Sequence, residues 1–223
     1  MSALWLGIDG ALGPFSAALI ARDQARPPRS AAAAGKDALE RGLGVIDEVL
    51  GTTALAQLEG IGVGTGPGAF TGLRIALSYA TGLALAARVP LVGISSFDAL
   101  EPAIVELPSA TFVEGRVGVV CVRLRTQAGE FRACGPYVRV ADALAGRIGV
   151  GSTLVSYGAA KGVSPALGER GVVVRRIDTA REKPALAIAR RALAVAPQDR
   201  SRSVQADYGE EHYASRAESP AAS

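Results

Sequence analysis

A glycine-rich turn between a short apolar strand and a long apolar helix constrains the fold of this chain more than any other feature. A short apolar run predicts a strand at 61–64, and apolar residues three and four positions apart predict a helix at 73–88. The turn between them supplies the first candidate site residues: Gly64, Gly66, Pro67, Gly68, Phe70, Thr71, Gly72 and Arg74. Glycine permits positive φ values and close backbone approach, so this strand–turn–helix is typical of an α/β unit.

Two interpretations of this turn stay open. Its amides lie at the N-terminal end of the following helix, which suits an anion or a phosphate. A turn that only allows tight packing fits the sequence equally well. The Gly-x-Gly-x-x-Ala spacing is a weak dinucleotide signal, because Ser95 and Ser96 follow the next strand where an acidic ribose ligand is expected. No Gly-Lys-Ser/Thr follows, which excludes a P-loop.

The remaining pattern predicts two α/β lobes. Before residue 106 we expect strands at 4–9, 15–21 and 90–94 and helices at 37–50 and 97–105, the last capped by Ser96. After it we expect a hairpin of 117–125 and 130–140, a short helix at 141–145, strands at 153–156 and 172–177, and a helix at 184–195. The predicted domains are therefore 1–105, 106–197 and a polar tail at 198–223.

Composition and charge narrow the class of protein. Hydrophobic residues make up 49% of the chain and charged residues 20%, which excludes wholesale disorder. The net charge is +3, and the basic stretches at 22–29 and 175–191 are not interleaved with aromatic residues, so direct RNA contact is not expected. The first residues lack a basic region, and the apolar stretch 82–92 contains Arg88 and Pro90 and is too short for a bilayer. We expect a soluble cytoplasmic protein with no membrane partner.

The side chains available for catalysis are few. Asp9 ends the first strand, where it either closes an Asx turn or holds a hydrated magnesium ion under a nucleotide phosphate. Ala11 brings no hydroxyl group to help bind phosphate. His212 is the only histidine and lies in the polar tail, so neither a histidine-based metal site nor a Ser–His pair is predicted. Glu101, Glu106 and Glu114 are interpreted as solvated surface charges.

Cys121 and Cys134 are predicted to be reduced thiols, as expected of a cytoplasmic chain. A redox pair on neighbouring strands is the alternative.

The order of these pieces resembles the TsaB (YeaZ) family. The resemblance lies in Asp9 after the first strand, the helix near 36–50, the glycine turn running into Leu73-Arg74, and the strand 90–94 with Ser95-Ser96 after it. It implies a two-lobed actin-like (ASKHA, ribonuclease H-like) α/β fold with mixed sheets and flanking helices. The related catalytic subunit TsaD has a metal-binding histidine pair where this chain has the two serines, so the resemblance indicates the non-catalytic branch.

The family's role supplies the functional expectation: a scaffold subunit, not an enzyme, that binds TsaD, with TsaE, for threonylcarbamoylation of adenosine 37 in tRNA. The resemblance places the partner interface on the helices at 37–50 and 73–87. Its candidate residues are Leu39, Leu43, Ile46, Leu50, Leu73, Leu77, Ala80 and Ala84.

Several alternatives accompany this expectation. One is a homodimer through the same helices that has lost the TsaD partnership. Another is a nucleotide-dependent phosphotransferase that uses Asp9 and the glycine turn. The family's old label, M22 glycoprotease-like, suggests a metallopeptidase with bound metal. Family members usually have Asp-Thr-Ser where this chain has Asp9-Gly10-Ala11. No tightly bound cofactor or metal is therefore expected, and weak or partner-dependent ATP or ADP binding is left open.

Overall fold

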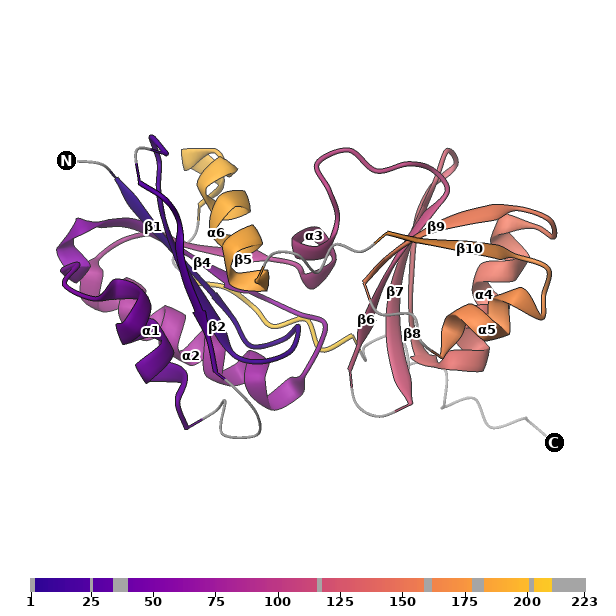
Figure 1. Cartoon of the computed structure of the whole chain (residues 1–223), viewed down its shortest axis with the longest axis horizontal. Helices are drawn as coiled ribbons and strands as arrows, with labels where there is room; N and C mark the ends of the chain where they lie inside the picture. Colours follow the sequence, from indigo (N-terminus) through magenta and orange to yellow (C-terminus); the bar gives the residue numbers. More distant parts are fainter. Residues whose placement is uncertain are drawn as a thin grey trace, which may run out of the picture. The chain divides into compact units, whose positions relative to one another are not determined.

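The computed structural model describes residues 3–24, 26–33, 40–115, 118–158, 162–177, 183–200 and 203–209. The chain divides into two compact units (Figure 1). The first contains Met1–Ala99 and Ala180–Asp207, and the second contains Leu100–Thr179 and Tyr208–Ser223.

A five-stranded mixed sheet forms the centre of the first unit, in the order β3-β2-β1-β4-β5. Its strands are β1 (Leu4–Asp9), β2 (Ser16–Ala21), β3 (Arg29–Ala32), β4 (Leu58–Gly64) and β5 (Leu91–Ile94). The first three strands pair antiparallel, and β4 and β5 run parallel to β1. Every residue of β1 and β2 is buried, because both faces of the sheet are covered.

Helices cover the two faces of this sheet separately (Figure 1). On one face α1 (Gly42–Leu50), the short 3₁₀ helix η2 (Leu55–Gln57) and α2 (Phe70–Ala87) pack over Leu6 and Ile8. On the other face α6 (Pro184–Ala194) packs over Trp5, and the 3₁₀ helix η3 (Pro197–Asp199) follows. A side chain at Gly62 would lie 2.6 Å from the Cβ of Ala192, so this glycine lets α6 approach the sheet closely.

The second unit repeats the same topology. Its strands are β6 (Ser109–Glu114), β7 (Val119–Thr126), β8 (Gly129–Pro136), β9 (Thr153–Gly158) and β10 (Val173–Ile177), in the order β10-β9-β6-β7-β8. Its helices are α4 (Tyr137–Ile148) and α5 (Val163–Gly168), and α3 (Ser96–Leu100) precedes its first strand. In both units three antiparallel strands are followed by two parallel strands, each reached through a helix. The predicted two-lobed actin-like fold is confirmed, although its topological repeat has no counterpart in the sequence pattern.

The predicted domain boundaries differ from the two units. The helix predicted at 184–195 forms as α6, but it belongs to the first unit and not to the lobe 106–197. Its apolar stripe packs on the first sheet, where glycines leave room for it. Part of the predicted loose tail also belongs there, because the described residues 203–207 pack against the first unit.

Some predicted elements are shorter or were missed. The helix expected at 97–105 ends at Leu100, because Pro102 disfavours helical backbone in the residue before it. Its first turn is capped by Ser95 and not by Ser96: the backbone N–H of Phe97 donates to Ser95 Oγ at 3.1 Å. The strands β3 and β6 and the helix α5 were not predicted, and the chain turns from strand to helix at Pro136 and not after residue 140.

The two cysteines correct another prediction. Cys121 and Cys134 lie opposite each other on β7 and β8, with their Cα atoms 4.1 Å apart, and they form a disulfide. Directly opposed residues of an antiparallel pair come this close when they do not exchange backbone hydrogen bonds. The expectation of two reduced thiols is therefore wrong for this structure.

Candidate functional site

The glycine-rich turn lies at the carboxyl end of β4, and the chain's own backbone fills it. A side chain at Gly72 would overlap the carbonyl oxygen of Gly10, and one at Gly68 would overlap that of Ala11. The N–H of Ala69 donates to the same Ala11 oxygen at 2.9 Å. The turn therefore packs directly on the β1–β2 connection, as the tight-packing interpretation requires.

The C-terminal segment covers the same end of the sheet. The N–H of Asp207 donates to the carbonyl oxygen of Thr65 at 2.7 Å, and a side chain at Gly66 would overlap the Asp207 carbonyl. A side chain at Gly93 would lie 2.6 Å from Val204 Cγ1. The glycines that suggested a phosphate cradle thus accept a returning chain segment.

Asp9 is the one carboxylate at this end of the sheet that the sequence singled out, and it is fully buried. The backbone N–H of Leu12 donates to its Oδ2 at 3.0 Å, which confirms the Asx-type turn. Its Oδ1 has no hydrogen-bond partner among the described residues, and neither has Oγ of Ser16, which lies opposite Asp9 on β2. Burial raises the pKa of Asp9 to about 6, against the opposing effect of the backbone N–H groups. Asp9 thus holds its own turn and keeps one acceptor oxygen unpaired.

The predicted interface residues divide between core and surface. Five of them are buried in the first unit and cannot contact a partner in the folded chain: Ile46, Leu50, Leu73, Ala80 and Ala84. Leu43 is 52% exposed and Leu77 is half-buried. Leu39 lies outside the described residues. The apolar spacing that suggested an interface mostly marks the sides of α1 and α2 that pack on the sheet.

A different side of α2 carries exposed apolar groups. Phe70 is 55% exposed and Leu85 is 67% exposed. Positions 70, 74, 78, 81 and 85 lie on one side of a helix with 3.6 residues per turn, and all five residues there are exposed. We call this set the α2 stripe: Phe70, Arg74, Ser78, Thr81 and Leu85. Sequence spacing did not single it out, because small and polar residues interrupt the apolar ones.

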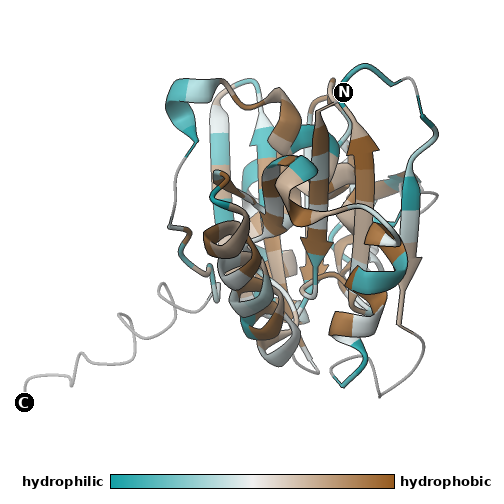
Figure 2. Ribbon diagram, turned by 90° about the vertical axis from the view of Figure 1, so that its left-hand side faces the viewer, coloured by the Kyte–Doolittle hydropathy of each residue, from teal (hydrophilic) through white to brown (hydrophobic). Residues whose placement is uncertain are grey.

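The composition of α2 is unusual for a helix at the surface. Five of its 18 residues are buried, and Arg74 is its one charged residue. Its guanidinium group lies over the ring of Phe70, 5.3 Å from the ring centre. By length and composition alone α2 is long and apolar enough to cross a membrane, but the core helix of a soluble protein passes the same test. Figure 2 shows how apolar residues are distributed along the ribbon of the chain, seen from the side of the first unit.

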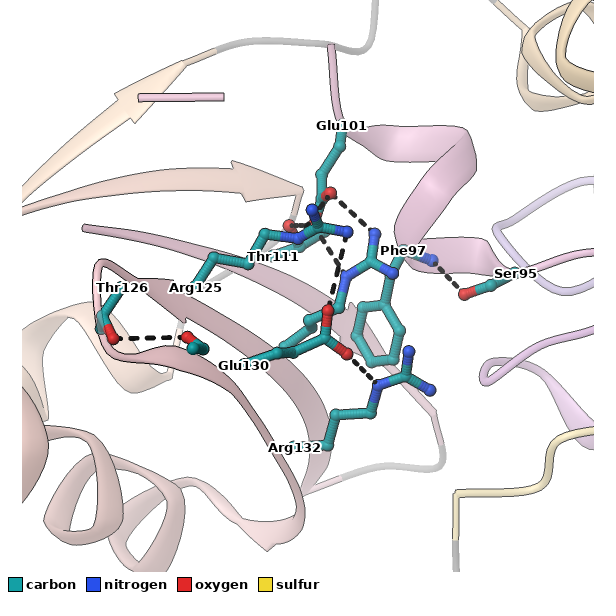
Figure 3. Close-up of polar contacts among 10 residues, drawn as sticks. Ser95, Phe97, Glu101, Thr111, Arg125, Thr126, Glu130 and Arg132 are labelled. Atoms are coloured by element: carbon teal, nitrogen blue, oxygen red, sulfur yellow. Dashed lines mark hydrogen bonds and ion pairs between the residues drawn. The ribbon is translucent and has the colours of Figure 1, made fainter. Parts of the chain in front are cut away.

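The second unit contains a buried ion pair that sequence reasoning missed (Figure 3). Glu101 was predicted to be a solvated charge, but it is 7% exposed. Its Oε1 accepts from Arg123 Nε at 2.9 Å and from Thr111 Oγ1 at 2.5 Å, and its Oε2 lies 2.7 Å from Arg123 Nη2. Arg125 lies 3.3 Å from Oε2 and links the pair to Glu130. This bidentate contact fastens the segment after α3 to β6 and β7.

The other two glutamates near the lobe boundary are exposed, as predicted, and Glu106 forms an ion pair with Arg175.

The sequence matches one family model and two named relatives. The model, described as TsaD, tRNA N6-adenosine threonylcarbamoyltransferase, matches residues 31–145, just over half of the chain. A relative from Haemophilus influenzae, named tRNA threonylcarbamoyladenosine biosynthesis protein TsaB, is 35% identical over 104 residues. The Escherichia coli protein of the same name is 41% identical over 59 residues. These matches cover 41% and 26% of this chain and only 44% and 26% of the two relatives.

Solved structures extend the likeness to nearly the whole chain. A Pseudomonas aeruginosa protein described as similar to peptidase YEAZ superposes with a TM-score of 0.65 at 22% identity, over 93% of this chain and 99% of that one. YeaZ from the same organism gives 0.61 at 22% identity, over 89% and 95%. At this identity the likeness shows the fold. The family rests on the sequence model, which matches over half of the chain: the chain belongs to the family that the TsaD model describes, and the relatives and solved structures that it resembles carry the names TsaB and YeaZ.

Proposed function

We propose that this chain is a cytoplasmic, non-catalytic partner subunit that binds TsaD, with TsaE, for threonylcarbamoylation of adenosine 37 in tRNA. Both relatives are named tRNA threonylcarbamoyladenosine biosynthesis protein TsaB, which supports a role for this chain in the same biosynthetic process. The exposed α2 stripe supports the mode of action, because it offers a surface for another protein.

The main support for this proposal is the free energy that a partner would gain by covering the apolar side chains of the α2 stripe. A surface helix of a globular protein normally presents charged residues to water, whereas the outer side of α2 has only Arg74. Full burial of a side chain such as Phe70 or Leu85 contributes roughly 1.5–3 kcal/mol. Ser78 and Thr81 between them are small enough to let a partner helix approach closely. A helix of the partner that lies along the stripe would therefore bury both large side chains together.

The geometry at the end of the first sheet supports a role without catalysis. The glycine turn is filled by the backbone of Gly10 and Ala11, and the carboxylate of Asp9 is used in its own turn. These groups stabilise the fold, and a partner would supply the reacting groups.

One observation favours a second candidate, a nucleotide-dependent phosphotransferase. The unpaired Oδ1 of Asp9 lies buried near the β1–β2 turn, and a carboxylate oxygen of this kind would suit the binding of a hydrated magnesium ion. Weak or partner-dependent binding of ATP or ADP would follow from the same site. Calorimetry with magnesium and ATP on the isolated protein tests it: heat that disappears in Asp9→Asn favours the phosphotransferase, and no heat in wild type removes it.

Variants of the stripe test the partner role. Leu85→Glu and Thr81→Glu should each weaken association with TsaD from the same organism by at least tenfold, because each buries a charge in an apolar contact. Ile104→Glu is the matched control, since Ile104 is 88% exposed in the second unit. Leu43→Glu tests whether α1 takes part.

Affinity for TsaD that stays unchanged in Leu85→Glu, Thr81→Glu and Leu43→Glu would refute an interface on these helices. Dimerisation of this chain alone, lost in the same variants while no complex with TsaD forms, would favour the homodimer. Each variant is first checked by circular dichroism, so that loss of binding is separated from loss of fold.

A further inference from the structure

The disulfide between Cys121 and Cys134 joins an edge strand to the rest of the second sheet. β8 stands at the end of the strand order, and its neighbour among the described strands is β7. The cysteines lie near the end of β8 that leads directly into α4. The covalent bond therefore fastens both the edge of the sheet and the approach to the following helix.

The residues beside the disulfide oppose the pairing of these two strands. Arg123 and Arg132 lie directly opposite each other, two residues from the cysteines and on the same side of the sheet. Like charges in this position destabilise a strand pair. Ion pairs offset the repulsion: Glu101 holds Arg123, and the Glu130 carboxylate lies 2.8 Å from Arg132 and 3.6 Å from Arg125 (Figure 3). The disulfide holds the strands together next to this like-charged pair.

The two cysteines differ in how far solvent reaches them. Cys134, on the edge strand, is half-buried, whereas Cys121 is only 5% exposed. Thiol–disulfide exchange begins when a thiolate attacks one sulfur atom of the disulfide, so access decides which sulfur is attacked. A thiol from solution would therefore reach Cys134, and Cys121 would be the leaving group.

We propose that Cys121 and Cys134 form a redox switch that small thiols open and that controls the order of β8. A thiolate attacks Cys134 Sγ, the S–S bond breaks, and Cys121 leaves as a thiolate that takes up a proton. A second thiolate attacks the resulting mixed disulfide and frees the Cys134 thiol, so that two thiols are oxidised to one disulfide. Oxidised glutathione reverses both steps.

Reduction should loosen the edge strand and leave the rest of the unit folded. The pairs Val122–Ala133 and Val120–Gly135 flank the cysteines and exchange backbone hydrogen bonds, because the cysteine pair between them does not. Without the disulfide, the opposed arginines favour local opening at this end of β8. Local opening of this kind exposes the N–H groups of these pairs to exchange with water.

Incubation of the full chain in glutathione buffers tests the switch. Millimolar reduced glutathione should reduce the disulfide in the folded chain, and oxidised glutathione should restore it; alkylation of free thiols and mass spectrometry measure the reduced fraction. In the reduced chain the N–H groups of Ala133 and Gly135 should exchange with solvent at least tenfold faster by NMR. The N–H of Val155, which donates to the carbonyl oxygen of Pro108 at 3.0 Å, should exchange at an unchanged rate.

Variants separate the parts of this inference. Cys121→Ser/Cys134→Ser should show fast exchange on β8 with or without glutathione. Arg132→Gln should slow exchange in the reduced chain, because it removes the like charge opposite Arg123. Cys134 in the Cys121→Ser variant should react with iodoacetamide at least tenfold faster than Cys121 in Cys134→Ser, in line with their exposure.

Three results would overturn the switch. One is a disulfide that persists in millimolar reduced glutathione, as a purely structural disulfide does. Another is reduction without faster exchange at Ala133 and Gly135. The third is loss of the whole circular dichroism spectrum on reduction, which would make the disulfide a requirement of the fold. Equal alkylation rates of the two cysteines would overturn the assignment of Cys134 as the residue attacked.

Discussion

Replacing Asp9 with asparagine should abolish a fall in stability that the wild-type chain shows as the pH rises from about 4 to above 6. Asp9 is fully buried, and its pKa rises from 3.8 to about 6 because burial disfavours the charged form. Below pH 3.8 the carboxyl group is protonated in both the folded and the unfolded chain. Between the two values the unfolded chain loses its proton first, so the folded state is progressively disfavoured as the pH rises.

The size of this effect follows from the two pKa values. Their difference of about 2.2 pH units, at 1.36 kcal/mol for each unit, corresponds to roughly 3 kcal/mol of unfolding free energy above pH 6. The slope cannot exceed about 1.4 kcal/mol per pH unit, because one proton is involved. Asparagine keeps an acceptor oxygen for the N–H of Leu12 and carries no charge.

Urea denaturation at a series of pH values from 4 to 8 measures this difference. For each protein we compare how the unfolding free energy changes with pH, and we subtract the change in Asp9→Asn from that in wild type. Any pH-independent effect of the amide group on stability cancels in this difference. Asp47→Asn is the matched control, because Asp47 is an exposed aspartate on α1, and its profile should follow wild type. Parallel profiles for wild type and Asp9→Asn would refute the argument from burial. Stabilisation of wild type by millimolar magnesium above pH 6, absent in Asp9→Asn, would support the phosphotransferase candidate.

Three further substitutions test the packing directly. Glu101→Gln should lower the unfolding free energy by about 3–5 kcal/mol, because it leaves the buried guanidinium group of Arg123 without its counter-charge; a loss below about 1 kcal/mol in urea denaturation would contradict the buried pair. Gly72→Ala should lower the unfolding free energy by roughly 1–3 kcal/mol, because the added methyl group overlaps the backbone of the β1–β2 turn. An unchanged melting temperature would show that the turn is looser than described. Replacing Cys121 and Cys134 together with serine should lower the unfolding free energy by about 2–4 kcal/mol, because it removes the disulfide. A reducing agent should lower the melting temperature of wild type but not of this variant.

Local sequence patterns predicted the helices and strands whose apolar residues recur at the spacing of a single buried face. The strand of β1 was predicted at its observed bounds, and the helix of α6 was predicted to within one residue, with its proline in the first turn. The family resemblance correctly implied the two-lobed fold. The strand β3 was missed because its four residues, Arg29–Ala32, contain no alternating apolar pattern.

Features that depend on contacts between distant segments were not predictable from the pattern. Helical spacing cannot tell the side of α2 that packs on the sheet from a side that binds a partner, so Leu73 and Ala80 were expected in an interface and lie in the core. Nothing in the sequence placed Glu101 beside Arg123, because strand register decides that contact. For the same reason, the sequence did not show that Arg26 and Arg190 line one cavity, between the β2–β3 connection and α6.

The partner role itself is tested most directly by size-exclusion chromatography with light scattering on this chain, on TsaD from the same organism, and on their mixture. We predict a new peak whose mass equals the sum of one copy of each protein; this peak should be absent when Leu85→Glu replaces wild type and should be retained with Ile104→Glu. A mixture that elutes as the two separate proteins at every concentration tested would contradict it.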